Sequence, residues 1–392
     1  MNPVVKLLPG RHKRLKSGYP WIFSNEVTKD DGDPIAPGSA VTIVGDNGEI
    51  YGTALFNTHS LVIGRMIGRS AGVIPDIDFF SGRFARALAL RDRLFTKPFY
   101  RLVHAEADGL PGLIVDRYGD AVVVQCNIVG MDMRLEAILD ALDRTISPQT
   151  VILRNDSRGR VQEGLPLDVT TLRGESRAPV FLQENGANFA VNFTQGQKTG
   201  WFYDQRRNRA FVASLSSGGR LIDFYCYGGG FAVQALKAGA AEAVMVDRSA
   251  MALEMAAASA ARNSVAERCQ FVKRDSFTEM ERLSAAGERF DVVVADPPAF
   301  VKSKKDFSRG SRAYRKMTRL AASLVAPEGI LFVASCSHNV APHVFTDLVK
   351  QGVADVGRSG RILRSAGAGP DHPVHHALPE TAYLKSLTLQ LD

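Results

Sequence analysis

Near-continuous apolar runs alternate with segments of helical spacing from about residue 181 onward. The runs are RLIDFYC, AVMVDR, CQFVKRD, FDVVVAD and GILFVASC, and amphipathic segments begin near Phe231, Ala250, Ser276, Ser308 and Ala341. Apolar strands that alternate with helices are typical of a parallel, doubly wound α/β sheet. Ligands of such sheets bind beyond the carboxyl ends of the strands, so the residues at those ends become candidates for a site.

The chain before this sheet follows two other patterns. In the first zone, SAVTIVGDNGEIYGTALF places an Asp-Asn-Gly turn between two strands, and a small β-barrel fits the zone. The next zone is of the α+β type, since FSGRFARALALRDRLF and MRLEAILDALDRTI have helical spacing and GLIVDRYGDAVVVQCNIV predicts a hairpin. The pattern therefore predicts three domains, at residues 1–74, 75–180 and 181–392.

Composition narrows the class of protein. The chain has 392 residues and a formal net charge of +7, a balance that favours a polyanionic partner such as nucleic acid but also serves solubility. Its four cysteines form no CxxC pair, which argues against a zinc site or a disulfide framework. There is neither an apolar signal-peptide core nor a run long enough to span a membrane. We expect a soluble cytoplasmic protein without a metal.

Acidic residues and glycines stand at the first three strand ends. The first strand carries Asp223 and leads into Gly228–Gly230, which allow the backbone to approach a ligand closely. The loop matches neither GxGxxG nor a P-loop, so a nucleotide-type cofactor without phosphates suits it. Asp247 is placed to accept ribose hydroxyls and Asp275 to accept an adenine amino group, although each is alternatively a helix N-cap. Together the three acids favour S-adenosylmethionine, which is positively charged.

The last two strand ends carry candidate chemistry. The fourth ends in Asp296-Pro-Pro-Ala-Phe300, where the prolines form a rigid corner, Asp296 can bind a base edge and Phe300 can stack on a flipped base. The fifth ends at Cys336, beside that corner if the two strands are adjacent. A thiolate there can add to C6 of a cytosine and make C5 reactive. The alternative is an inert buried cysteine with an N-cap aspartate and a core phenylalanine.

Two basic segments suggest RNA contacts. The segment GRHKRLKSGYPWIF interleaves basic residues with aromatic ones, and KSKKDFSRGSRAYRK after the Asp-Pro-Pro corner does the same with Phe307 and Tyr314. Cations bind phosphates and rings stack on bases, whereas the alternative in both places is a solvated basic surface. The candidate RNA contacts are Arg11, Lys13, Arg14, Lys16, Phe300, Lys304, Lys305, Arg309 and Arg312.

Several of these motifs resemble those of a known family. LPGRHKRLKSGYPWIFSNEV, ADGLPGLIVDRYGD, GQKTGWFYDQRRNR, DFYCYGGGF, DPPAF, SCSH and DHPVHHALPETAYLK are similar to segments of the RlmI-like bacterial methyltransferases, which make 5-methylcytosine in large-subunit (23S) ribosomal RNA. The resemblance covers essentially the whole chain. It implies a PUA-like RNA-binding barrel and a central α+β domain, followed by a Rossmann-like class I methyltransferase domain. It also implies 23S rRNA or its precursor as partner, and a homodimer only weakly.

The resemblance assigns roles to individual residues. Cys336 is then the nucleophile and Asp296 the acid that contacts the base. The implied cofactor-binding residues are Lys198, Asp204, Asp223, Tyr225, Gly228, Gly230, Asp247, Asp275 and Ser276. Many RNA 5-methylcytosine enzymes carry a second cysteine where this chain has Pro298, so the group that takes the C5 proton is left unassigned. An exocyclic-amine RNA methyltransferase and a non-catalytic RNA-binding assembly factor remain the alternatives.

Overall fold

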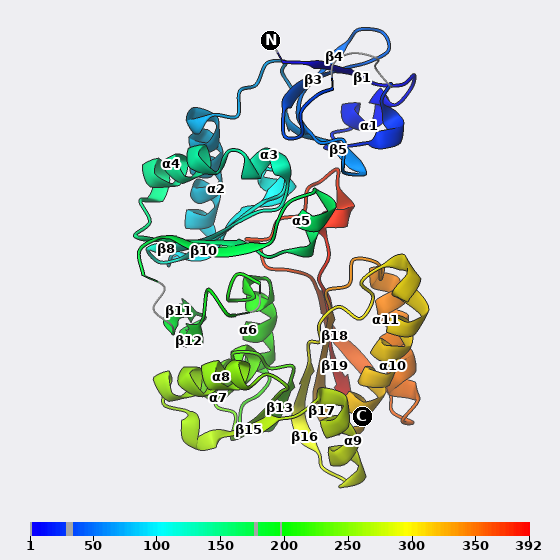
Figure 1. Cartoon of the computed structure of the whole chain (residues 1–392). Coiled ribbons are helices and arrows are strands. Elements are labelled where there is room, and N and C mark those ends of the chain that lie inside the picture. The colour runs from blue at the N-terminus through cyan, green and yellow to red at the C-terminus, as the bar shows by residue number, and fades with distance from the viewer. Residues whose placement is uncertain (1, 29–33, 176–178, 197) are drawn as a thin grey trace. The chain divides into compact units, whose positions relative to one another are not determined.

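The computed structural model describes residues 2–28, 34–175, 179–196 and 198–392 (Figure 1). The chain divides into two compact units, and neither is a single stretch of sequence. The first consists of residues 1–177, 193–201 and 370–381, and the second of residues 178–192, 202–369 and 382–392. The predicted domain boundaries near residues 74 and 180 stay predictions, whereas the two later segments in the first unit are a feature that the sequence pattern did not indicate.

The first unit begins with a five-stranded sheet in the order β1-β3-β4-β5-β2. The predicted hairpin is present as β3 and β4, which pair in antiparallel register. Gly52 in β4 has a φ of +131°, and a Cβ there would lie 2.1 Å from the carbonyl oxygen of Gly68, so the strand pair requires glycine at this position. The elements are β1 (Val4–Lys6), α1 (His12–Lys16), β2 (Trp21–Phe23), η1 (Ser24–Glu26), β3 (Ala40–Val44), β4 (Ile50–Phe56) and β5 (Val62–Gly68).

A second five-stranded sheet of the first unit has the order β10-β9-β8-β7-β6. Both predicted helices are present, as α2 and α4, and they pack on each other over a common apolar core. The predicted hairpin is formed by β7 and β8. The elements are α2 (Ile77–Leu94), β6 (Phe99–His104), η2 (Ala105–Asp108), β7 (Leu113–Tyr118), β8 (Ala121–Cys126), α3 (Val129–Asp132), α4 (Leu135–Ile146), β9 (Thr150–Asn155), α5 (Arg158–Gln162) and β10 (Asp168–Arg173).

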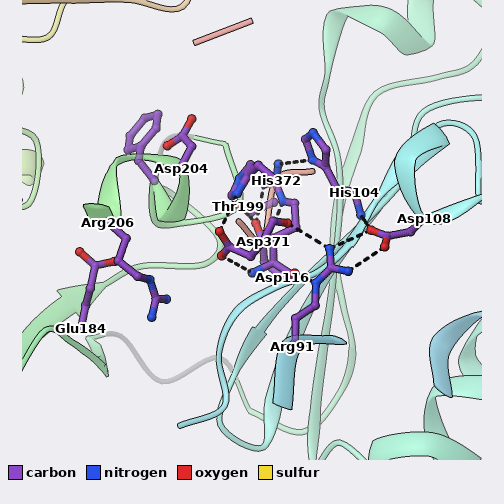
Figure 2. A network of polar contacts seen from close by, with 12 residues as sticks. Arg91, His104, Asp108, Asp116, Glu184, Thr199, Asp204, Arg206, Asp371 and His372 are labelled. Carbon is purple, nitrogen blue, oxygen red and sulfur yellow. Dashed lines mark hydrogen bonds and ion pairs between the residues drawn. The ribbon is translucent and has the colours of Figure 1, made fainter. Parts of the chain in front are cut away.

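A buried arginine holds the segment 370–381 within the first unit. Arg91 of α2 is fully buried and forms a two-pronged ion pair with Asp108, with N–O distances of 2.7 and 2.8 Å (Figure 2). Its Nη2 also donates to the main-chain oxygen of Asp371, at 3.0 Å. A buried guanidinium requires such partners, because leaving it without them would cost several kcal/mol. Asp371 is therefore fixed by a helix that lies 280 residues earlier in the chain.

The segment 193–201 is held by a second buried carboxylate. Asp116 of β7 forms a two-pronged pair with Arg101, at 2.8 Å for each bond, and accepts from the hydroxyl of Thr199 at 2.5 Å. The hydroxyl of Tyr118 donates in turn to the main-chain oxygen of Thr199. These bonds satisfy a carboxylate that is inaccessible to solvent, and they explain why the segment belongs to this unit.

The second unit is a seven-stranded sheet in the order β15-β14-β13-β16-β17-β19-β18. The first five strands of this spatial order, from β15 through β14, β13 and β16 to β17, pair in parallel. Strand β19 runs antiparallel to both of its neighbours. The strands are β13 (Arg220–Phe224), β14 (Glu242–Asp247), β15 (Cys269–Lys273), β16 (Phe290–Ala295), β17 (Val325–Ser335), β18 (Gly360–Ala366) and β19 (Lys385–Leu391), with a separate hairpin of β11 (Val180–Glu184) and β12 (Ala187–Val191).

The helices of this unit connect the parallel strands, as the sequence predicts for a doubly wound sheet. The helices are η3 (Tyr203–Gln205), α6 (Arg206–Ser214), α7 (Gly230–Lys237), α8 (Ala250–Arg262), η4 (Ala266–Arg268), α9 (Ser276–Ala285), η5 (Lys304–Asp306), α10 (Phe307–Ser323) and α11 (Pro342–Ala354), and η6 (Pro379–Thr381) lies in the first unit. The α/β class and the five predicted strands are confirmed. The two final strands were missed, because an antiparallel edge pair follows no strand–helix alternation. No helix of the described residues is long and apolar enough to cross a membrane.

Candidate active site

The carboxyl ends of five parallel strands bring the predicted residues to one edge of the sheet. Asp223 lies in β13 and Asp247 is the last residue of β14, while Asp275 follows β15 by two residues. Asp296 and Cys336 directly follow β16 and β17, which are adjacent. Because parallel strands end at the same edge, these five side chains share one end of the second unit.

The loop after β13 has an unusual backbone. Tyr225 and Tyr227 have φ values of 63° and 48°, in the left-handed region that side chains other than glycine rarely adopt. Gly229 follows with a φ of +75°, and a Cβ at Gly230 would lie 2.5 Å from Nε of Arg209. Such backbone strain costs free energy and concentrates at ligand-binding sites. Gly229 and Gly230 are thus sterically required where they stand, whereas the role of Gly228 stays a prediction.

Asp223 is a buried carboxyl group with an unsatisfied oxygen. Its exposed fraction is 1 %, and Oδ2 accepts from the main-chain N–H of Ala232 at 3.3 Å. Oδ1 has no hydrogen-bond partner among the described residues. Burial raises the pKa of Asp223 to about 8, and the charges of Asp296 and Asp247 act in the same direction. A positively charged ligand group would stabilise the ionised form of this carboxyl group.

Asp247 and Asp275 differ in their surroundings. Asp247 is buried and accepts from the main-chain N–H groups of Tyr227, at 3.1 Å, and Ser249, at 2.9 Å. Two lone-pair positions of its carboxylate remain for a diol. Asp275 is exposed and caps α9 through the N–H groups of Phe277 and Thr278, so the N-cap alternative applies to it. Its contact with adenine stays a prediction.

The start of α6 supports Asp296. Nε2 of Gln205 donates to Oδ2 of Asp296 at 2.8 Å, and Nδ2 of Asn208 donates to Oε1 of Gln205 at 2.6 Å. Asp204, in the same turn, accepts from the hydroxyl of Tyr383 at 2.5 Å. Sequence reasoning did not single out Gln205, although it lies within the quoted motif GQKTGWFYDQRRNR.

Cys336 lies against the Asp-Pro-Pro corner, as predicted. Its Sγ is 4.0 Å from the main-chain oxygen of Pro297, and the side chain is partly exposed. In contrast, Cys226 and Cys126 are buried, and burial raises the pKa of the Cys126 thiol to about 12 and that of Cys226 well above its ordinary value. Among the cysteines at this edge, Cys336 is therefore the accessible one.

Three buried hydroxyl groups hold the backbone on both sides of Cys336; we call Tyr314, Ser335 and Ser337 the hydroxyl cluster. The Ser335 hydroxyl donates to the phenolic oxygen of Tyr314 at 2.8 Å, and the Tyr314 and Ser337 hydroxyls are 2.8 Å apart. The main-chain N–H of Val301 donates to Oγ of Ser337 at 3.1 Å. The cluster links the strand end that carries Cys336 to the segment that follows the Asp-Pro-Pro corner.

A buried lysine completes the turn after Cys336. Lys385 pairs with Ser335 across β17 and β19, and its exposed fraction is 8 %. Its Nζ donates to the main-chain oxygens of Ser337, at 2.5 Å, and Val340, at 2.8 Å. Burial lowers the pKa of Lys385 to about 8, and the charge of Cys336 acts in the opposite direction. Sequence reasoning assigned this lysine no role, although it ends the quoted motif DHPVHHALPETAYLK.

Comparison with known proteins identifies the family. A family model described as S-adenosylmethionine-dependent methyltransferase matches residues 155–376, and a PUA-like domain model matches residues 5–69. Curated relatives named ribosomal RNA large subunit methyltransferase I, from Aeromonas salmonicida (strain A449) and Shewanella amazonensis (strain ATCC BAA-1098 / SB2B), are 36 % and 35 % identical over the whole of both chains. The chain belongs to this methyltransferase family.

Solved structures support the same fold. A protein from Streptococcus mutans described as an S-adenosylmethionine-dependent methyltransferase has a TM-score of 0.84 at 20 % identity, with 99 % of this chain and all of that one covered. A methyltransferase solved in complex with SAH has the same TM-score at 21 % identity and covers 99 % of both chains. The predicted PUA-like and class I methyltransferase folds are thus confirmed.

The site suits the cofactor of this methyltransferase family. S-adenosylmethionine is a cation with a ribose diol, and the edge offers the unsatisfied buried oxygen of Asp223 and the free lone pairs of Asp247. Tyr225 lies near Ser276 and Asp275, and burial, reinforced by the charge of Asp275, raises the pKa of Tyr225. Lys198 is counted with the first unit, so its predicted cofactor contact stays a prediction.

The first basic segment of this methyltransferase is exposed but partly neutralised. In and directly before α1, Arg11, Lys13, Arg14 and Lys16 are all exposed, while Arg14 pairs with Glu26 at 3.3 Å and Lys16 with Glu49 at 2.9 Å. Carboxylates thus neutralise half of the predicted patch.

The segment after the Asp-Pro-Pro corner differs from the prediction of a loop in which Phe307 and Tyr314 contact RNA. Most of it is helix α10 rather than loop, and Tyr314 is fully buried, so Tyr314 does not face RNA. The ring of Phe300 lies 4.7 Å from that of Tyr314 and is partly buried, which leaves its predicted base stacking untested. All seven basic residues of the segment 302–316 are exposed, and they include the four predicted RNA contacts, Lys304, Lys305, Arg309 and Arg312.

Proposed function

We propose that the protein methylates C5 of a cytosine in large-subunit ribosomal RNA through a covalent bond between Cys336 and C6. The observation that carries the proposal is the position of an accessible thiol 4.0 Å from the main chain of the Asp-Pro-Pro corner, at the edge that holds the cofactor acids. The names of the curated relatives support the choice of RNA, and the PUA-like match agrees with it.

The chemistry requires a nucleophile because C5 of cytosine is unreactive in the resting ring. The thiolate of Cys336 adds to C6, and the new S–C6 bond makes C5 electron-rich. S-adenosylmethionine, when bound, supplies the methyl group that C5 gains. A base then removes the C5 proton, and the S–C6 bond breaks to restore the C5–C6 double bond and the thiolate. Asp296 is suited to hold the base edge, since Gln205 fixes its carboxylate.

Exposed cations near the same edge are suited to hold the RNA backbone. Lys304 and Lys305 lie in η5, directly after the Asp-Pro-Pro segment, and Arg309 and Arg312 lie in the first two turns of α10. Arg309 shares Asp306 at 3.2 Å, an exposed pair that contributes little and that a phosphate can replace. We assign these residues to phosphate contacts and leave base recognition to Asp296 and Phe300.

The decisive experiment uses RNA that carries 5-fluorocytosine at the target position. Fluorine cannot leave C5 as a proton does, so elimination stalls and the protein stays attached to the RNA. We expect a covalent adduct with the wild type and with Cys226→Ala, which removes a buried thiol at the same edge. We expect no adduct and no methyl transfer with Cys336→Ala, while cofactor and RNA binding persist.

The alternative is methylation of an exocyclic amine gripped by Asp296, a reaction that needs no thiol. A Cys336→Ala protein that keeps full activity and forms no adduct would establish that alternative. Absence of methyl transfer by the wild type on any large-subunit RNA, with RNA binding intact, would favour a non-catalytic assembly factor. Mass mapping of the methylated RNA identifies the modified atom in each case.

A further inference from the structure

A hollow in the first unit is lined by arginines that the sequence did not bring together. It has a volume of about 430 Å³ and lies between the end of β5 and the first turns of α2. We call it the arginine groove; its lining includes Ile67, Arg69, Phe79, Arg83 and Arg86. The volume is within the range typical of small-ligand sites.

Among the described residues, most other arginines of the first unit form an ion pair with a carboxylate, and the arginines of the groove do not. Arg65, Arg91 and Arg101, for example, each pair with a carboxylate at 3.4 Å or less. Within the described parts of the chain, no ion pair is formed by Arg69, Arg83 or Arg86. The one acid in the lining, Asp78, is already paired with Arg144 of α4, at 2.7 Å.

Arg83 is held in place at the floor of the groove. Its Nη2 donates to the main-chain oxygen of Ile67 at 2.7 Å, and its guanidinium lies 5.2 Å from the centre of the Phe79 ring. Partial burial lowers the pKa of Arg83, and the charge of Arg86 adds to the effect. Positioning like charges together is unfavourable in the free protein when the one acid of the lining, Asp78, pairs with Arg144 instead, and a bound anion offsets that cost.

We propose that the arginine groove binds a backbone phosphate of the RNA substrate. Arginine forks match phosphate oxygens in two-pronged geometry, and most protein contacts to nucleic acids go to the backbone. The groove also offers the partly buried ring of Phe79, on which a base or sugar can pack. The inference rests on the proposed function, because it takes the substrate to be RNA.

The test compares two double variants that remove the same charge. Arg69→Gln/Arg86→Gln changes two exposed groove residues, and Arg93→Gln/Arg158→Gln changes two exposed arginines of the same unit outside the groove. RNA affinity is measured by titration with a labelled large-subunit RNA fragment over a range of salt concentrations. Arg69 and Arg86 are on the surface, so folding is expected to be preserved, and urea unfolding of both variants verifies it.

We expect the groove variant to bind RNA on the order of ten-fold more weakly, and its plot of log affinity against log salt to be shallower by about 0.7 to 0.9 per lost phosphate contact. The control variant should stay close to the wild type. Equal affinity and equal salt slope in the two variants would overturn the proposal. This outcome does not depend on which atom is methylated. The groove can bind RNA even if the methylated atom is not C5. Conversely, methylation of C5 does not support the proposal if the groove variant binds RNA like the control variant.

Discussion

Lys385 lies opposite Ser335 in the antiparallel pair of β17 and β19, and its ammonium group binds the turn that begins at Cys336. An ammonium carries three N–H donors, and two of them are used by the oxygens of Ser337 and Val340. A positive charge is thus built into the backbone that presents the proposed nucleophile. This buried charge affects the free energy of unfolding and the way in which that free energy depends on pH.

Lys385→Met is expected to change how stability depends on pH. The folded pKa of about 8 lies below the ordinary 10.5, so between these values the unfolded chain binds more protons than the folded protein. The contribution of Lys385 to stability is therefore least favourable below about pH 8 and improves as the pH rises to 10.5. The free energy of unfolding, measured by urea titration from pH 7.5 to 10.5, should show this rise in the wild type relative to Lys385→Met.

The methionine variant also leaves two carbonyl oxygens without their donor, a loss of roughly 1–3 kcal/mol that does not depend on pH. Lys350→Met, at an exposed position of α11, serves as the control and should follow the wild type throughout. Parallel curves for the wild type and Lys385→Met would show that the lysine keeps its ordinary titration.

Asp223→Asn is expected to change the stability of the protein and its cofactor affinity in opposite directions at pH 8. The folded pKa of about 8 lies above the ordinary 3.8, so the folded protein binds the extra proton between these values and stability falls as the pH rises. The asparagine variant should lack this fall and be more stable than the wild type at pH 8. It should also bind S-adenosylmethionine more weakly, by roughly 1–3 kcal/mol, because a neutral amide replaces a carboxylate partner.

Calorimetry and urea titration at pH 5 and pH 8 measure both effects. Asp347→Asn, at an exposed position of α11 outside the predicted cofactor pocket, is the matched control. Unchanged cofactor affinity in Asp223→Asn would remove Asp223 from the cofactor pocket.

Tyr314→Phe is expected to slow methyl transfer without weakening cofactor binding. The change keeps the buried ring but removes the oxygen that joins Ser335 to Ser337. Cys336 and the Asp-Pro-Pro segment then lose a common support, so kcat should fall by roughly ten-fold, as expected for small losses of positioning, while KM for RNA changes little. The measurement is steady-state methyl transfer together with S-adenosylmethionine titration.

Ser284→Ala provides the comparison for this variant. It removes one hydroxyl of a 3.0 Å pair with Ser323, near the C-terminal end of α10. Both variants lose a hydroxyl contact of the same helix, but only Tyr314→Phe lies at the site. Equal kcat values in the two would mean that the hydroxyl cluster supports folding alone.

The sequence predicted the parallel strands and the position of Cys336 because both follow from local patterns. Apolar runs mark the strands, and strand ends in a parallel sheet meet at one edge. Tyr314 was misjudged because its neighbours in sequence are basic, whereas the helix places it on the same face as Met317 and Ala321, which are buried.

Other features depend on contacts that no local pattern reports. Lys385 becomes part of the site only through the antiparallel pairing of β19 with β17. The arginine groove joins Arg69 to Arg83 and Arg86 through the packing of a strand end on a helix. Gln205 acquires its role only once Asp296 is beside it. Each is a relationship between elements, and a sequence alone gives no distance between them.

The order of synthesis bears on the buried ion pairs of the first unit. Arg91 and Asp116 are made early, but the oxygen of Asp371 and the hydroxyl of Thr199 that satisfy them come later in the chain. Chains are made from the N-terminus, so a nascent chain that ends near residue 180 lacks both partners. The first unit therefore reaches its final hydrogen bonding only when all but about the last twenty residues of the protein have been translated. A gene fragment that ends near residue 177 would therefore encode the first unit incompletely, and the remaining fragment would carry two segments that belong to the first unit.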